Sequence, residues 1–374
     1  KPESKRISID KIEILNFKNI ASAQLEFSPQ INVLVGMNGS GKTNLLDAIY
    51  YLSITKSSLG LTDLQCVHRG EEFFMLQSSY VGAQSRESVV CSFKKKGSKV
   101  VRRNGKEYGR LSEHIGLIPV IFSSPSDTSL INEASDERRR FLNSSLSQIR
   151  GGYLELLIRY NHLLAERNRS LKVGGAFSEV IEVIDMQLVE VGSQIFDIRE
   201  HFVSQLAPRT QALYEAISGG RESVTVAYKS ALREADYATL LRESFSRDLV
   251  LGHTTVGVHR DDLRLEIDGV PIRKFGSQGQ QKSMLLALKL ALSEIITQSK
   301  GIRPLLLLDD VFDKLDMSRV ENLLRVVSSS EFGQIFITDS NKVRLDRILE
   351  RLDSGWRLLS VDGGEFEVLE STVI

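Results

Sequence analysis

One segment near the start of the chain restricts its fold more than any other. The compact apolar run Ile31–Val35 predicts a buried strand, and residues 36–43, GMNGSGKT, follow it directly. These residues match the pattern G-x-x-x-x-G-K-T in full. Leu45, Ile49 and Leu52 then share one face of a predicted amphipathic helix. A strand, a glycine-rich turn and a helix in this order predict a phosphate-binding loop in an α/β fold.

The chemistry of this loop explains its spacing. A glycine-rich turn exposes successive backbone N–H groups, and the following helix adds the positive end of its dipole. Lys42 is expected to reach the β- and γ-phosphates of ATP, and the Thr43 hydroxyl to hold Mg²⁺. The motif alone leaves kinases, GTPases, helicases and ABC-type ATPases open. The nucleotide-binding residues predicted here are Gly36, Met37, Asn38, Gly39, Ser40, Gly41, Lys42, Thr43 and Asn44.

A second apolar run, far along the chain, completes the predicted site. Residues 304–308, PLLLL, predict a buried strand that ends in Asp309 and Asp310. An acid at the carboxyl edge of such a strand is typical of a Walker B element, which holds Mg²⁺. We therefore expect Asp309 on the metal side and Asp310 as the general base that polarises the attacking water. Lys42 is the second predicted catalytic residue.

A short segment upstream selects among the P-loop classes. A predicted helix that precedes the Walker B strand opens with Ser277, Gln278, Gly279 and Gln280. This order, together with the letters SQGQ, resembles the signature of ABC-type ATPases, although Gln278 stands where transporters usually carry Gly. The resemblance implies that the four residues bind the γ-phosphate of a nucleotide held by a second copy of the chain. It therefore implies a homodimer that forms on ATP binding.

The residues after the Walker B strand extend this resemblance. Asp316 stands where the D-loop of ABC-type ATPases meets the partner protomer. Residues 334–338 predict the next buried strand. Transporter-type ATPases carry a switch His after this strand, whereas this chain has Asp339, Ser340 and Asn341. The pattern leaves open which residue senses the γ-phosphate.

Five short segments carry a more specific resemblance. Residues 257–263, GVHRDDL, are joined by residues 16–19 (NFKN), 43–49 (TNLLDAI), 136–142 (DERRRFL) and 309–312 (DDVF). Together they resemble the RecF family of bacterial recombinational-repair ATPases, whose G-P-H-R-D-D-L differs here only at Val258.

The RecF resemblance also implies roles for residues outside the phosphate loop. It implies that Lys18 and Asn19 approach the α-phosphate and sugar of the nucleotide, and that His259 and Arg260 lie in its neighbourhood. A solvated strand end is the alternative for the first pair. A satisfied polar turn is the alternative for the second.

The resemblance to the RecF family implies a function as well. It implies an ATP-dependent DNA-binding protein that acts in the repair of gapped DNA or DNA at stalled replication forks, including the SOS response. Its partners would be duplex DNA with single-strand/double-strand junctions, the RecO and RecR proteins, and indirectly RecA, which they help to load onto single strands. Asp310 is a shorter side chain than the Glu that most ABC-type ATPases use, so slow hydrolysis is expected.

A long helical insertion separates the two halves of the site. An apolar residue recurs at alternating steps of three and four, which predicts a coiled-coil-like helix. Its seam residues are Ile181, Ile184, Leu188, Val191, Ile195, Ile198 and Phe202. An earlier amphipathic helix at residues 154–165 is expected to join it as a hairpin through Val173, Gly174 and Gly175. The predicted fold is an α/β ABC-type P-loop ATPase head, a mixed sheet with flanking helices, at residues 1–124 and 251–374, with a mainly helical lobe inserted at 125–250.

The overall amino-acid composition gives no indication for or against a DNA partner. Lys+Arg and Asp+Glu are 48 each, so any DNA-binding surface must come from local charge. The candidate basic residues are Lys94, Lys95, Lys96, Lys99, Arg102, Arg103, Lys106, Arg150, Arg159, Arg167, Arg169 and Lys172, although such clusters are usually solvated faces. With only two cysteines and no apolar run of roughly 18 residues, the sequence predicts a cytoplasmic protein without a membrane span.

Four other readings compete with this one. Another SMC-like ATPase head would need long heptad tracts around a hook motif. The ATPase subunit of a transporter would need a membrane partner, and the GVHRDDL segment and the missing switch His oppose it. A P-loop kinase would not need residues 277–280. A non-hydrolysing binding module would require Asp310 to be inert.

Overall fold

The computed structural model describes residues 5–82, 86–173, 178–329, 331–350 and 355–372. The chain folds into two compact units, and the predicted α/β architecture with a mainly helical insertion is confirmed. Residues 251–277 were predicted in the head, but they group with the second unit because a strand within them pairs with residues 224–229. The first unit comprises Lys1–Asp127, Leu213–Arg221 and Gln278–Ile374, and the second comprises Thr128–Ala212 and Glu222–Ser277.

The predicted phosphate loop follows a strand inside a six-stranded sheet of the first unit. The order is β17-β16-β4-β15-β14-β9, and all neighbours are parallel except β16 and β17. Val35 pairs with Asp339 and Leu308 with Ser123, so these strands end at one edge, where open α/β sheets bind ligands. The strands are β4 Ile31–Val35, β9 Val120–Ser123, β14 Leu305–Leu308, β15 Ile335–Asp339, β16 Trp356–Asp362 and β17 Glu365–Ser371.

A second six-stranded sheet of the same unit is an antiparallel meander. Its order is β3-β2-β5-β6-β7-β8, and along β5 buried residues alternate with half-buried ones. This alternation is typical of a sheet with one face on a core. The strands are β2 Ser8–Phe17, β3 Ile20–Glu26, β5 Phe73–Val81, β6 Arg86–Lys94, β7 Lys99–Arg103 and β8 Lys106–Glu107; a small parallel pair joins β1 Lys5–Arg6 to β13 Ile302–Arg303.

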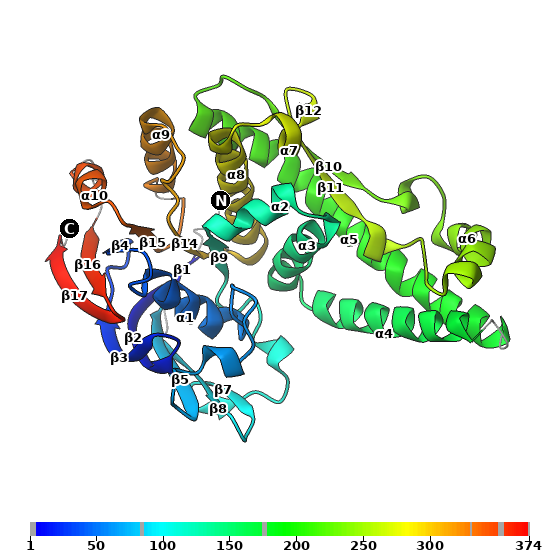
Figure 1. Cartoon of the computed structure of the whole chain (residues 1–374), viewed down its shortest axis with the longest axis horizontal. Helices are drawn as coiled ribbons and strands as arrows, with labels where there is room; N and C mark the ends of the chain where they lie inside the picture. The colour runs from blue at the N-terminus through cyan, green and yellow to red at the C-terminus, as the bar shows by residue number, and fades with distance from the viewer. Residues whose placement is uncertain (1–4, 83–85, 174–177, 330, 351–354, 373–374) are drawn as a thin grey trace. The chain divides into compact units, whose positions relative to one another are not determined.

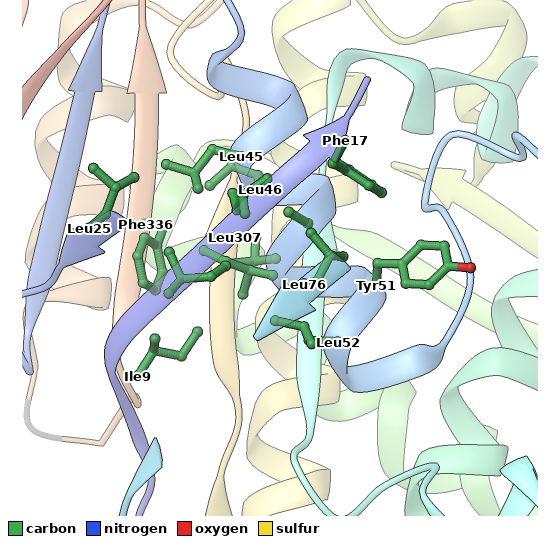
Figure 2. Packing of buried hydrophobic residues seen from close by; sticks show 14 of the residues in the cluster. Ile9, Phe17, Leu25, Leu45, Leu46, Tyr51, Leu52, Leu76, Leu307 and Phe336 are labelled. Atoms are coloured by element: carbon green, nitrogen blue, oxygen red, sulfur yellow. The ribbon is translucent and has the colours of Figure 1, made fainter. Parts of the chain in front are cut away.

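The helix after the phosphate loop, α1 (Lys42–Ile54), lies between these two sheets (Figure 1). Its buried residues include Leu45 and Leu46, which Figure 2 shows among Leu307 and Phe336 of the parallel sheet and Ile9 of the antiparallel one. A helix buried on both sides has its position set by packing. The start of α1, which carries Lys42, is therefore held firmly against the edge of the parallel sheet.

The other helices of the first unit bring further polar residues toward the same strands. The predicted helix before the Walker B strand is confirmed as α8, and most of its length is buried. The remaining elements of this unit are α8 Gln278–Lys300, α9 Met317–Val327, α10 Lys342–Leu349, η1 Leu64–Cys66, η2 Leu111–Glu113 and η3 Pro125–Asp127.

The second unit is built around an antiparallel helical hairpin. Pairs of side chains from α4 and α5 meet in reverse order along the two helices, as Tyr153 with Arg199 and Arg167 with Asp185 do. All seven predicted seam residues of α5 are buried, so the heptad prediction is confirmed. Gly174 and Gly175 of the predicted connection lie outside the described residues. Among the described helices, none is long and apolar enough to cross a bilayer.

Shorter elements complete the second unit. Three strands form one antiparallel sheet in the order β10-β11-β12, and the hairpin helices are the longest elements. The last turns of α5 belong to the first unit, because that unit includes Leu213–Arg221. The elements are α2 Thr128–Asn132, α3 Ser135–Ile149, α4 Tyr153–Lys172, α5 Ser178–Ser218, α6 Tyr237–Leu251, α7 Ile272–Phe275, β10 Val224–Lys229, β11 Asp262–Ile267, β12 Val270–Pro271, η4 Ala231–Arg233 and η5 Val258–Arg260.

A buried ionic network ties the helices of the second unit together. The guanidinium of Arg167 is fully buried and donates to Asp185 at 2.6 Å, to Asp248 at 2.6 Å and to Thr254 at 2.9 Å. Buried charges need such partners, since an unpaired one is costly. Arg167, one of the candidate basic residues, is therefore an interior residue that holds helices together and does not belong to an exposed surface.

Candidate functional site: a phosphate loop beside two carboxylates

The glycines of the predicted phosphate loop are required by the shape of the turn. Gly39 and Gly41 have φ angles of 82° and 120°, in the left-handed region that favours glycine. A Cβ on Gly36 would lie 2.2 Å from the backbone oxygen of Val361, so only glycine fits there. The predicted order of strand, turn and helix is confirmed.

Lys42 lies at the inner side of this loop. Its ammonium donates hydrogen bonds to the backbone oxygens of Gly36 at 2.5 Å and Met37 at 2.9 Å. Burial lowers the pKa of Lys42, and the carboxylates of Asp309 and Asp310 partly oppose this shift. The ammonium thus lies at the loop, where its three donors can turn toward phosphate oxygens.

The predicted metal-side residues meet across two segments of the sheet edge. The Thr43 hydroxyl donates to one oxygen of the Asp309 carboxylate at 2.8 Å, and the Thr338 hydroxyl donates to the other at 2.7 Å. A hydroxyl and a carboxylate side by side are hard oxygen ligands that suit Mg²⁺, which usually takes one or two protein ligands together with substrate phosphates and water. The described residues contain no cluster of three or more His, Cys, Asp or Glu side chains suited to a metal.

Asp310 begins the turn after the Walker B strand in an unusual backbone conformation. Its φ is 48°, which is uncommon for a residue with a side chain. Its N–H donates to the Thr338 hydroxyl at 2.9 Å, and its backbone oxygen accepts from Lys282 at 3.1 Å. Burial raises the pKa of the Asp310 carboxyl, and the negative charges of Asp339 and Asp313 raise it further. A carboxylate with a raised pKa is a better proton acceptor, as a general base needs to be.

The two residues predicted from the NFKN segment differ in where their side chains lie. Asn19 donates to the backbone oxygen of Ser40 at 3.3 Å and accepts from Asn44 at 2.7 Å, so it lies against the phosphate loop. The buried ammonium of Lys18 donates to the Asp47 carboxylate at 2.5 Å. The positive charge of Lys18 is therefore neutralised by Asp47 on α1.

The signature and the D-loop occupy the starts of two helices. Gln278 is the first residue of α8, and Ser277 directly before it is exposed. Asp316 caps α9, since its carboxylate accepts from the N–H of Arg319 at 2.9 Å and from the Ser318 hydroxyl at 2.6 Å. These hydrogen bonds lower the pKa of Asp316. Gly279 and Gln280, the last two residues of the signature, lie in the first turn of α8.

Three residues of this site were not predicted from the sequence. Thr338 bonds both aspartates, and Lys282 donates to the turn between the Walker B strand and the D-loop. Where transporters carry the switch His, the buried Asp339 pairs with Arg344 at 2.7 Å. The sequence does contain a signal for Thr338. It is a polar residue near the carboxyl end of β15, the strand that pairs with the Walker B strand. Neither Lys282 nor Arg344 carries a comparable signal.

Two of the family segments meet in the second unit. Arg138 of the DERRRFL segment binds the carboxylate of Asp262 at 2.5 and 3.1 Å, and Arg139 donates to the backbone oxygen of Asp261 at 2.8 Å. The carboxylate of Asp261 is buried and accepts from Arg199 at 2.9 Å. These contacts make the two segments part of the framework of the second unit.

His259 is one of the residues that line a partly open pocket of about 210 Å³. Its ring bonds the Tyr160 hydroxyl at 2.8 Å and the backbone oxygen of Thr254 at 3.1 Å. Burial lowers the pKa of His259 to about 4, so the imidazole is neutral near pH 7. The placement of His259 and Arg260 near a nucleotide stays a prediction.

The candidate DNA-contacting residues differ in exposure, and some of the exposed ones also form ion pairs, as Lys95 does with Glu72, Arg102 with Glu107 and Arg159 with Glu190. Lys94 at the end of β6, and Lys95 and Lys96 directly after it, are exposed. Lys99 instead donates to the backbone oxygen of Thr55 at 2.8 Å. Arg103 is bound to Glu87, whereas exposed positions are found for Arg102, Lys106, Arg150, Arg159, Arg169 and Lys172.

Comparisons with known proteins identify the family of the chain. The family model described as RecF/RecN/SMC N terminal domain matches residues 8–353. The "DNA replication and repair protein RecF" of Phocaeicola vulgatus is 43% identical over 96% of this chain and 97% of its own length. That of Flavobacterium johnsoniae is 42% identical over 94% of this chain and 99% of its own.

Solved structures show the same relationship. A structure described as the recombination mediator protein RecF-ATPrS in the RecFOR pathway has a TM-score of 0.86 and 29% identity, and covers 98% of this chain and all of its own. An Smc head domain from Pyrococcus furiosus has a TM-score of 0.58 at 16% identity, over 98% of this chain and 96% of its own, which is a likeness of fold. The chain therefore belongs to the RecF family of DNA replication and repair proteins, within the wider RecF/RecN/SMC group.

Proposed function

We propose that this protein binds and hydrolyses ATP with Mg²⁺ and uses the cycle to act on DNA in recombinational repair. The observation that carries the proposal is the hydrogen-bonded set of Thr43, Asp309, Thr338 and Asp310 beside the glycine loop. It supplies a phosphate cradle, a pair of hard oxygen ligands and a proton acceptor in one place. Relatives named as RecF-ATP and RecF-ATPrS support the choice of nucleotide.

ATP is expected to bind with its phosphates over the start of α1. The N–H groups of residues 36–41 and the N-terminal end of α1 would hold the β-phosphate, and Lys42 would transfer its donors from the loop carbonyls to phosphate oxygens. Thr43 and Asp309 would hold Mg²⁺, which neutralises charge on the phosphates when bound. Asn19 lies against the same loop and is proposed to contact the α-phosphate or sugar.

Hydrolysis is proposed to use Asp310 as general base. Its raised pKa favours removal of a proton from the attacking water. Thr338 donates to Asp309 and accepts from the N–H of Asp310, so one hydroxyl sets the geometry of the metal side and the base side together. Aspartate reaches less far than the Glu used by most ABC-type ATPases, and slow turnover is part of the proposal.

The second half of the catalytic site is proposed to come from another copy of the chain. Residues 277–280 begin α8 in an exposed or half-exposed position, as a surface that receives the γ-phosphate of a partner's nucleotide should. Asp316, half-exposed at the start of α9, would lie at the same interface. ATP would thus bring two copies together, and hydrolysis would release them.

DNA is the proposed target, and duplex DNA with single-strand/double-strand junctions is the proposed form. The curated relatives are named for DNA replication and repair. The exposed turn at Lys94, Lys95 and Lys96 is a candidate for phosphate contacts. Interaction with RecO and RecR, and through them with RecA at single-stranded gaps, belongs to the same proposal, since a related structure is assigned to the RecFOR pathway.

One experiment tests this function most directly. The ATPase rate is measured with and without gapped duplex DNA for the unmodified chain, Lys42→Ala and Ser277→Arg, with dimerisation followed by light scattering. We expect hydrolysis and ATP-driven dimers only in the unmodified chain, because each variant removes one half of the composite site. Normal dimerisation of Lys42→Ala with ATP would contradict the proposal.

A further inference from the structure

The helix that begins with the signature also contacts the turn that carries the proposed base. Lys282 lies one turn after Gln278 on α8 and is only 8% exposed. Its ammonium donates to the backbone oxygen of Asp310 at 3.1 Å. Both residues belong to the first unit. Helix α8 thus carries the signature at its start. One helical turn later it carries Lys282, which contacts Asp310 of the same chain.

Two further contacts fasten the start of α8 to the same segment. The Ser283 hydroxyl accepts from Arg319 at 2.8 Å and donates to the backbone oxygen of Gly279 at 2.8 Å. A Cβ on Gly279 would lie 3.1 Å from the backbone oxygen of Lys314, so helix and turn are in close approach there. The start of α8 therefore contacts the segment after the Walker B strand at several points between Asp310 and the D-loop helix.

The Lys282 hydrogen bond falls on a residue whose conformation needs support. Asp310 has a φ of 48°, and such conformations persist in residues with a side chain only when the surroundings hold them. Its peptide groups are held from two sides, by Thr338 at the N–H and by Lys282 at the oxygen. Loss of the Lys282 contact leaves one support, and the carboxylate of Asp310 moves with the backbone that carries it.

The charge of Lys282 matches its position. Burial lowers the pKa of Lys282, and the carboxylates of Asp310, Asp313 and Asp127 partly oppose this shift by favouring the charged form. The ammonium is thereby held in a buried place where it donates to the catalytic turn.

We propose that Lys282 is a positioning residue that couples the signature of each chain to that chain's own general base. When a partner's nucleotide binds residues 277–280, the start of α8 becomes more rigid. The hydrogen bond from Lys282 then fixes the backbone of Asp310 more firmly. Each ATP would then help to prepare the opposite site of the dimer for hydrolysis. The inference rests on the composite site proposed above and adds a link between its two copies.

The first test separates positioning from stability and binding. In Lys282→Met we expect kcat to fall by about tenfold to a hundredfold, as small misplacements of catalytic groups do, whereas ATP affinity and ATP-driven dimerisation stay unchanged. Lys282→Arg should restore much of kcat, because it keeps a cationic donor of similar length. Lys300→Met is the matched control, since Lys300 at the end of the same helix donates to the backbone oxygen of Gly116 at 2.8 Å rather than to the Asp310 turn.

The second test addresses the coupling itself. The effects of Ser277→Ala and Lys282→Met on kcat of the ATP-bound dimer are measured singly and together. Residues that act as one unit give strongly non-additive losses, so the double variant should be little worse than the more impaired single one. Additive losses, or an unchanged kcat in Lys282→Met, would overturn the coupling while leaving the ATPase proposal intact. If the unmodified chain neither dimerises with ATP nor hydrolyses it, the proposed function itself fails.

Discussion

The Thr43 hydroxyl donates a hydrogen bond of 2.8 Å to the Asp309 carboxylate. Thr43 lies in the first turn of α1 and Asp309 directly follows β14, so the pair exists only because α1 begins and β14 ends at the same edge of the sheet. The Thr43 hydroxyl and the Asp309 carboxylate are the groups that would hold Mg²⁺, because both offer hard oxygen ligands.

The first prediction concerns this oxygen pair. Asp309→Asn keeps the shape of the side chain but removes the charge that a hard cation requires. Mg²⁺ should increase the affinity for ATP in both proteins. We expect this increase to be at least about tenfold smaller in the variant than in the unmodified protein, because the variant has lost the charge of an acidic ligand. Titration of a fluorescent ATP analogue with and without Mg²⁺ measures this. Asp346→Asn, on the exposed surface of α10, serves as the control.

Thr338 supports the second prediction. Thr338→Val leaves one oxygen of Asp309 and the N–H of Asp310 without this partner inside the protein. Orphaned buried polar groups cost about 1–3 kcal/mol each, so the free energy of unfolding should fall by an amount of this order and kcat should fall as well. Urea denaturation and steady-state kinetics report the two effects. A Thr338→Ser variant with the same losses would show that the hydroxyl is not the cause.

The buried guanidinium of Arg167 leads to the third prediction. Arg167→Met leaves Asp248, which is fully buried, without its cationic partner. Breaking a buried ion pair from one side costs about 3–5 kcal/mol, and denaturant unfolding of the second unit should show a loss of this order. Arg169→Met, exposed on the same helix, should change stability by less than about 0.5 kcal/mol. Equal stability of both variants would contradict the described network.

The fourth prediction is a pH dependence of stability. The pKa of His259 is lowered from 6.5 to about 4 by burial. Between these pH values the unfolded chain binds a proton at this histidine and the folded chain does not, so stability falls as the pH falls through this window. His259→Gln removes that contribution. The unmodified protein should therefore lose about 1–3 kcal/mol more stability than His259→Gln between pH 7 and pH 4, as measured by urea midpoints, while His162→Gln on the exposed face of α4 should follow the unmodified protein.

The fifth prediction concerns DNA. Replacement of Lys94, Lys95 and Lys96 by Gln should weaken binding to duplex DNA and reduce its dependence on salt. Each lost phosphate contact lowers the slope of log affinity against log salt by about 0.9. Lys99→Gln is the comparison, because Lys99 is bound to Asp63 and Thr55 rather than exposed. A binding affinity that does not change with salt would exclude phosphate contacts as the main attraction.

Much of the architecture could be predicted from local pattern. Ile31–Val35, the glycine turn and α1 follow from apolar runs, helical periodicity and the need for glycine at Gly39 and Gly41. The α5 seam was also predictable, since its spacing of three and four requires one buried face. The domain boundary at residue 250 differed because β11 pairs with β10, and strand partners far apart in sequence leave no local signal.

The phosphate loop, the two aspartates after the Walker B strand and the family could all be identified from the amino-acid sequence, because each is a contiguous pattern with its own chemistry. Three other features could be found only from the three-dimensional arrangement: Thr338 joins the two aspartates, Lys282 supports Asp310, and Arg167 is buried. All three depend on contacts between segments that are far apart in the sequence. A hydrogen bond between distant segments depends on how helices and strands pack. A single Thr, Lys or Arg has no sequence pattern that distinguishes a side chain facing solvent from one bound to a buried polar group.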